Sequence, residues 1–205
     1  MEIIFENVTK GYGGNTVLSG LSVTVGENEI LQVTGASGAG KTTFLRLLMG
    51  LEKPDSGRIL GAERVSFSAV FQENRLCEQL DVITNLKMVC HGIQREELEQ
   101  EARRLLPEAS ALKVPAGELS GGMKRRAAIL RAMLAESDIV VLDEPFTGLD
   151  RENIGLVNDY ICDKRKGRTI VYVSHQEMLE IKENIQVNTL SLSLHTFTKG
   201  FNYLS

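Results

Sequence analysis

The chain has 205 residues, enough for one domain, or one domain with a subdomain, that buries roughly 70% of the surface of the unfolded chain. Its hydrophobic content of 42% and charged content of 24% are ordinary for a globular protein, and a net charge of −4 argues against a general attraction to nucleic acid. Three separated cysteines without a CxxC pair indicate reduced thiols rather than a zinc site or a redox pair.

The first third of the chain is predicted to be rich in strands. Alternating or continuous apolar residues are interrupted by turns rich in glycine, and only one stretch has helical character. We expect strands at 3–8, 17–25, 30–34, 58–60 and 65–71, a turn-rich loop at 10–15, a turn at 53–57 and a helix at 41–49.

The segment 35–43, GASGAGKTT, fits the pattern GxxxxGK[ST] and lies between a predicted strand and a predicted helix. Glycines let several backbone N–H groups turn toward an anion, and the helix N-terminus adds a positive dipole end. Lys41 offers a charge to outer phosphates, and the Thr42 hydroxyl can ligate Mg²⁺. A glycine-rich turn without a ligand is the alternative. The predicted nucleotide contacts are Gly35, Ser37, Gly38, Ala39, Gly40, Lys41, Thr42 and Thr43.

Beyond this loop the pattern predicts a helical segment and then alternating helices and buried strands. We expect a helical insert at about 75–118, helices at 123–135, 151–164 and 177–182, and strands at 139–142, 169–174 and 190–195. The predicted fold class is α/β: a P-loop NTPase core with a mainly parallel sheet (1–74 and about 119–205), an N-terminal antiparallel β subdomain and the helical insert.

Two further groups of residues could act on a nucleotide. Asp143 ends an apolar strand, where it can hold Mg²⁺ through water, and Glu144 can orient or deprotonate an attacking water. An acidic turn is the alternative. Residues 120–122 combine a hydroxyl with two glycines before a helix, which suits a second phosphate cradle, a simple N-cap, or both together. A second cradle would serve a nucleotide held by another copy of the chain.

Five segments, in this order, resemble the ATPase subunit of the ATP-binding-cassette (ABC) family, over nearly the full length of the chain. They are GASGAGKTT at 35–43, VFQ at 70–72, LSGGM at 119–123, IVVLDEP at 139–145 with GLD at 148–150, and VSH at 173–175. The family most often has glutamine where Met123 stands; because methionine is unbranched and tolerated in a helix, we expect the local geometry to survive.

The resemblance implies a role for each matching residue. Tyr12 would stack on adenine, and Gln72 would sense Mg²⁺ and the γ-phosphate and link the core to the helical insert. The γ-phosphate would also be contacted by His175 and, from a partner cassette, by Ser120, Gly121 and Gly122, with Asp150 at the dimer seam. The implied catalytic residues are Glu144, His175 and Gln72, and the implied Mg²⁺ ligands are Thr42, Gln72 and Asp143.

The resemblance further implies two copies that face each other head to tail around two Mg-ATP and power a membrane permease that docks near Gln72. The chain shows neither the apolar run of a signal peptide nor one long enough to span a membrane, so we expect it at the cytoplasmic face of the membrane. The absence of fused membrane helices favours an importer, with an extracytoplasmic binding protein as a further partner. Residues 71–76 and 123–126 are similar to the nitrate, sulfonate and taurine branch, and importers of thiamine precursors look alike.

Two other classes remain open at this point. A non-transport cassette protein would act on nucleic acid or the ribosome, but such proteins usually carry paired cassettes or a long coiled coil, and we expect no nucleic-acid partner here. A P-loop kinase for a small molecule is disfavoured by the LSGG segment and by His175.

Overall fold

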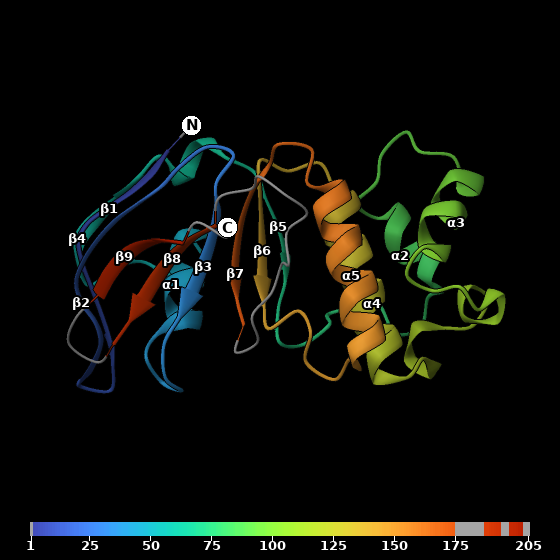
Figure 1. Cartoon of the computed structure of the whole chain (residues 1–205), viewed down its shortest axis with the longest axis horizontal. Coiled ribbons are helices and arrows are strands. Elements are labelled where there is room, and N and C mark those ends of the chain that lie inside the picture. Colours follow the sequence, from blue (N-terminus) through green and yellow to red (C-terminus); the bar gives the residue numbers. More distant parts are fainter. Residues whose placement is uncertain (1, 175–186, 194–196, 203–205) are drawn as a thin grey trace.

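The computed structural model describes residues 2–174, 187–193 and 197–202, the last range by its backbone (Figure 1). The predicted helix at 177–182 lies outside these residues. The elements form two sheets, with helices between the sheets and in layers on the outer side of the larger sheet (Figure 1). The predicted α/β class, with a mainly parallel sheet and a separate antiparallel sheet, is confirmed.

The smaller sheet is antiparallel, with the order β2-β1-β4, and consists of β1 (Ile3–Tyr12), β2 (Asn15–Val25) and β4 (Ser56–Leu60). The prediction of a loop over 10–15 was wrong, because β1 continues to Tyr12, which pairs directly with Asn15. Gly13 and Gly14 alone form the connection, and both have positive φ, as a two-residue hairpin turn requires. This hairpin places Tyr12 at one end of the sheet.

The larger sheet has the order β5-β6-β7-β3-β8-β9. All neighbours are parallel except β8 and β9, which are antiparallel. β9 was not predicted, since its residues include a lysine and a glycine, which are depleted in strands, and show no apolar alternation. The strands are β3 (Ile30–Thr34), β5 (Phe67–Val70), β6 (Ile139–Asp143), β7 (Thr169–Val173), β8 (Val187–Leu192) and β9 (Phe197–Asn202).

The larger sheet separates two apolar cores. Every residue of β6 is buried; Val140 and Leu142 face one core, while Ile139 and Val141 face the other. The first core is covered by α4 (Gly121–Leu134) and α5 (Arg151–Lys164), and the second contains α1 (Lys41–Leu48) between the two sheets (Figure 1). A strand covered on both faces needs apolar side chains in both directions, which explains the continuous apolar run of β6.

The helices α2 (Val82–Lys87) and α3 (Arg95–Arg103) lie on the outer side of α4 and α5 (Figure 1). Their apolar faces are buried in the first core, through Val82, Leu86, Leu98 and Ala102. Short 3₁₀ turns at 62–64, 109–112 and 116–118 complete the described elements. Within the described part of the chain, no helix is long and apolar enough to cross a membrane.

Candidate functional site

The loop between β3 and α1 is held in a conformation that demands glycine. A Cβ at Gly35 would lie 2.4 Å from the carbonyl oxygen of Leu192, and the φ of Gly35 is +148°. Gly38 and Gly40 have φ values of +80° and +92°, and a Cβ on Gly40 would press against Leu18. Since L side chains rarely adopt such backbone angles, the predicted glycine pattern follows from the path of the loop.

Lys41 and Thr42, the first residues of α1, direct polar groups to the mouth of this loop. The ammonium group of Lys41 donates to the carbonyl oxygens of Gly35 and Ala36 at 2.7 and 2.9 Å. The hydroxyl of Thr42 donates to a carboxylate oxygen of Asp143 at 3.3 Å. The phosphate-loop sequence and the predicted carboxylate at the end of β6 are therefore in direct contact.

A cavity of about 340 Å³ opens beside the loop and gathers most of the predicted site. Two apolar residues that we did not predict, Val17 and Val173, also line it. Gly35 and Ala39 shape the loop without lining the cavity. The predicted residues in its wall are Tyr12, Ser37, Gly38, Gly40, Lys41, Thr42, Thr43, Gln72, Asp143 and Glu144.

Asp143 is a buried acid with incomplete hydrogen bonding. One carboxylate oxygen, Oδ2, accepts from Thr42, whereas Oδ1 is buried and has no hydrogen-bond partner among the described residues. Burial raises the pKa of Asp143, and the hydrogen bond from Thr42 and the nearby charge of Arg125 partly oppose that rise. A buried carboxylate oxygen without a donor costs free energy, which a cation at this position would recover.

Glu144 follows in an unusual backbone conformation. Its φ is +51°, in the left-handed region that non-glycine residues rarely occupy. Its N–H donates to the carbonyl oxygen of Val173 at 2.9 Å, and its carbonyl oxygen accepts from the N–H of Thr147 and from the guanidinium of Arg125. A side chain held by a strained but well-anchored backbone is typical of functional sites.

Tyr12, at the end of β1, and Gln72, in the loop after β5, both line the cavity, and both are exposed. The hydroxyl of Tyr12 donates to Glu52, and the Lys10 ammonium lies 5.4 Å from its ring centroid. Partial burial, followed by the hydrogen bond to Glu52, raises the pKa of Tyr12. The predicted site residue His175 lies outside the described residues.

The signature residues 120–122 and Asp150 are not part of the cavity wall. Ser120 is the N-cap of α4, and its side chain accepts a hydrogen bond from the N–H of Met123 at 3.3 Å, as the N-cap interpretation requires. Because the donor is the backbone N–H, methionine in place of the family's usual glutamine at 123 leaves the cap intact. Asp150 caps α5 in the same way, accepting from the N–H of Asn153 at 2.9 Å, and these hydrogen bonds lower its pKa. Apart from the backbone of its own helix turn, no atom of the described residues lies within 4 Å of where a Cβ on Gly121 would be.

Arg125 is a further residue of the site that the sequence did not predict. Its side chain is buried beneath the cavity and donates to the backbone carbonyls of Gln72, Asp143 and Glu144. Burial lowers its pKa, and the negative charges of Asp143 and Glu144 raise it. Its only trace in the sequence is the arginine pair after the LSGG segment, and because arginines are mostly exposed, the pair does not reveal that one of them is buried.

One family model, described as ABC transporter, matches residues 18–147. Among curated proteins, the chain is 39% identical over 207 residues to "Fe(3+) ions import ATP-binding protein FbpC" of Brucella melitensis, covering 90% of this chain and 58% of that protein. It is 38% identical over 178 residues to "Aliphatic sulfonates import ATP-binding protein SsuB 1" of Agrobacterium fabrum, covering 83% and 64%. The chain thus spans less than two thirds of the length of these relatives.

Solved structures share the fold. An ATP-binding subunit of an ABC transporter matches with a TM-score of 0.79 at 25% identity, covering 98% of this chain and 90% of that one. A dimeric bacterial ABC transporter cassette matches with a TM-score of 0.80 at 23% identity, covering 96% and 98%.

Proposed function

Because the chain belongs to the ABC transporter family, we propose that it is an ATP-hydrolysing subunit that dimerises around two Mg-ATP and powers a membrane transporter. The observation that carries this proposal is the single cavity in which the phosphate loop, Asp143 and Glu144 meet. A glycine-rich loop that only connected β3 to α1 would need neither the buried Asp143 nor the strained Glu144 in the wall of the same cavity.

The triphosphate of ATP would lie along residues 37–43, where backbone N–H groups and the N-terminus of α1 attract anions. Lys41 would move its ammonium group from the loop carbonyls to the outer phosphates, a shift that needs only side-chain rotation. Tyr12 and Val17 stand in the same cavity wall and offer the adenine a ring and an apolar surface.

The donor set fits Mg²⁺. Thr42 and Asp143 supply hard oxygen ligands, and a cation would interact favourably with the buried Oδ1 of Asp143, which has no hydrogen-bond partner among the described residues. Gln72, in the same wall, would add an amide oxygen. When bound with ATP, the ion would neutralise charge on the β- and γ-phosphates. No cluster of three acidic, histidine or cysteine ligands occurs among the described residues, which agrees with a metal that shares its coordination with phosphate oxygens.

Glu144 would accept a hydrogen bond from the attacking water and orient it toward the γ-phosphate. The positive φ of Glu144 turns the chain away from the sheet directly after Asp143, so that consecutive carboxylates line one cavity. We assign Gln72 and His175 to the γ-phosphate from the family resemblance.

A second copy of the chain would complete the site. Residues 120–122 stand outside the cavity, and the fold leaves open space where a Gly121 side chain would be. An exposed glycine at a helix N-terminus, with no internal reason to be glycine, suits close approach by a phosphate held on another molecule. We place Asp150, the N-cap of α5, at the same dimer seam.

The two relatives described above are named as import ATP-binding proteins, which favours an importer. The chain would then bind an integral-membrane permease at the cytoplasmic face of the membrane, and an extracytoplasmic binding protein would deliver the cargo. Purification of the tagged chain from its native membrane tests this part of the proposal. Recovery of a permease is expected, and recovery of nucleic acid or ribosomes instead would contradict it.

Titration calorimetry with ATP and phosphate-release measurements test the central proposal. We expect tight ATP binding and phosphate release that require magnesium. A folded preparation that binds no adenine nucleotide in the presence of magnesium would overturn the proposal, and transfer of the phosphate to a small molecule would indicate a kinase.

A further inference from the structure

One buried side chain connects the two segments that would act on the γ-phosphate. The side chain of Arg125 enters between the loop that follows β5 and the loop that follows β6. It is only 3% exposed. Helix α4, which carries it, begins at the signature residues, so the arginine lies little more than one helical turn from Ser120.

All three nitrogens of the guanidinium are used, and they point in two directions. Toward the first loop, Nη1 donates to the carbonyls of Phe71 and Gln72 and, at 3.3 Å, to the side-chain oxygen of Asn74. Toward the second loop, Nη2 donates to the carbonyls of Asp143 and Glu144, and Nε donates to that of Pro145 at 3.2 Å. A guanidinium is suited to this task because its donors form a rigid planar fork.

The same helix holds the first loop at two more points. Lys124 donates to the carboxylate of Glu78 at 3.4 Å, and Arg131 donates to the carbonyl of Asn74 at 3.4 Å. Of these contacts, only those of Arg125 also reach the second loop. Its neighbour Arg126 turns elsewhere, to the side chain of Asn153 at 2.6 Å in α5.

We infer that Arg125 is a positioning residue that fixes the backbone of Glu144 and the loop of Gln72 relative to each other, and so sets both side chains against the γ-phosphate. This inference rests on the proposed function of the site. The strained φ of Glu144 needs external support, and Arg125 provides it through the Glu144 carbonyl. Among its described hydrogen bonds Arg125 makes none with the phosphate loop 35–43, so we expect its loss to impair hydrolysis more than nucleotide binding.

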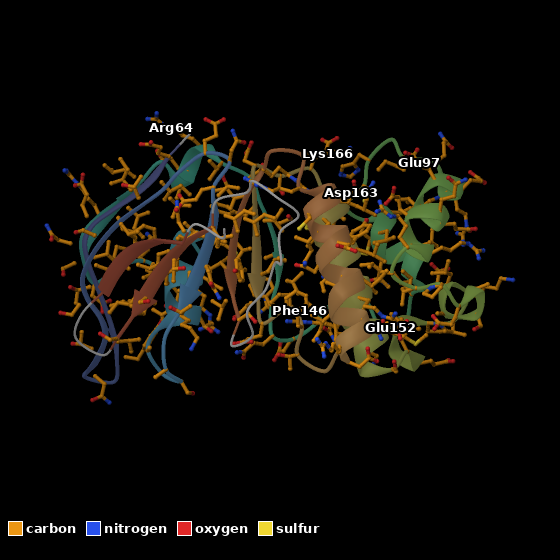
Figure 2. All side chains as sticks on the ribbon, in the orientation of Figure 1. Arg64, Glu97, Phe146, Glu152, Asp163 and Lys166 are labelled. Carbon is orange, nitrogen blue, oxygen red and sulfur yellow. The ribbon has the colours of Figure 1, made fainter. Side chains whose placement is uncertain are left out.

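The test compares Arg125→Gln with Arg168→Gln, a control that also removes a guanidinium from backbone carbonyls. Arg168 donates to the carbonyls of Met133, Ala135 and Lys164. It stands two residues after Lys166, which Figure 2 shows at the opposite end of α5 from Glu152. For Arg125→Gln we expect kcat to fall by about 10²-fold, the effect of a misplacement on the order of 1 Å, while the affinity for Mg-ATP stays within about 3-fold. The control variant should keep its kcat within about 3-fold.

Two further variants separate positioning from mere stability. Arg125→Lys keeps the charge but loses the fork, so it should resemble Arg125→Gln; full activity of the lysine variant would overturn the inference. Adding Arg125→Gln to Glu144→Gln should slow hydrolysis by less than about 10-fold more, because the part of the effect that acts through Glu144 is already lost and only the part through Gln72 remains. A full additional 10²-fold loss would show an independent effect and contradict the inference.

Amide hydrogen exchange tests whether Arg125 holds the two loops, and this measurement does not depend on ATP hydrolysis. Arg125→Gln should speed amide exchange by about tenfold or more in residues 71–76 and 143–147, but not in 44–48 of α1. Unchanged exchange in either loop would overturn the inference.

If the natural chain released no phosphate, the proposed function would fail, and exchange alone would decide the role of Arg125. Should Arg125→Gln not fold, Arg125→Lys provides the same readout, and Asn74→Ala, which removes one acceptor, should loosen 71–76.

Discussion

The hydroxyl of Thr42 donates to the carboxylate of Asp143 at 3.3 Å, although 101 positions separate the two residues in the chain. Strands β3 and β6 are not neighbours, since β7 lies between them. The contact therefore forms above the carboxyl ends of the strands, where parallel sheets place their ligand sites. It joins the loop that would hold a triphosphate to the carboxylate that would help to hold its magnesium.

The first prediction concerns the proposed general base. Glu144→Gln should keep nucleotide affinity and slow hydrolysis by about 10²- to 10⁴-fold, because the amide cannot accept a proton but fills the same space. Calorimetry and steady-state phosphate release measure the two quantities separately. Turnover close to that of the natural chain would remove Glu144 from this role.

Lys41→Ala should abolish tight ATP binding. The loop keeps its glycines and its shape, but it loses the ammonium group that sits at its mouth on the Gly35 and Ala36 carbonyls. Lys113→Ala is the matched control, since that lysine is exposed and outside the cavity wall, and it should bind ATP normally. Equal affinities of the two variants by calorimetry would count against the phosphate-loop interpretation.

Local patterns were enough to predict the fold class and most elements. The glycine spacing of 35–40, the apolar run of 139–142 and the cap at Ser120 each reflect forces that act within a few residues. The hairpin at Gly13 and Gly14 was missed because a glycine pair marks either a loop or a tight turn, and only strand pairing distinguishes the two. Strand β9 was missed because pairing with β8, rather than its own residues, makes it a strand.

The candidate site could be predicted where chemistry and sequence order coincide, as for Lys41, Asp143 and Glu144. Arg125 could not be predicted, because its acceptors are backbone carbonyls from two distant loops, and a carbonyl leaves no signal in residue type. The strained φ of Glu144 was also hidden, since glutamate is not a residue that turn patterns associate with a positive φ.

Gly35 and Gly121 differ in whether the fold requires a glycine at their positions, and one alanine substitution at each distinguishes them. Gly35→Ala should destabilise the fold by about 1–3 kcal/mol, because its Cβ would meet the Leu192 carbonyl at a strained backbone angle. Gly121→Ala should change the free energy of unfolding by less than about 0.5 kcal/mol, since its Cβ would enter open space. Urea denaturation followed by circular dichroism measures both, and equal losses would contradict the distinction.

Ser120→Arg tests the shared site. The arginine should leave ATP binding to the single chain intact, because Ser120 is not in the cavity wall, and should block ATP-driven dimerisation by filling the space where a partner's phosphate would dock. Ser120→Ala is the necessary control, since both variants lose the cap on Met123, at a cost of about 0.5–2 kcal/mol, but alanine adds no bulk. Light scattering in the presence of Mg-ATP, in the Glu144→Gln background that preserves bound ATP, should show a dimer for the alanine variant and a monomer for the arginine variant. A dimer of the arginine variant would place the second copy elsewhere on the molecule.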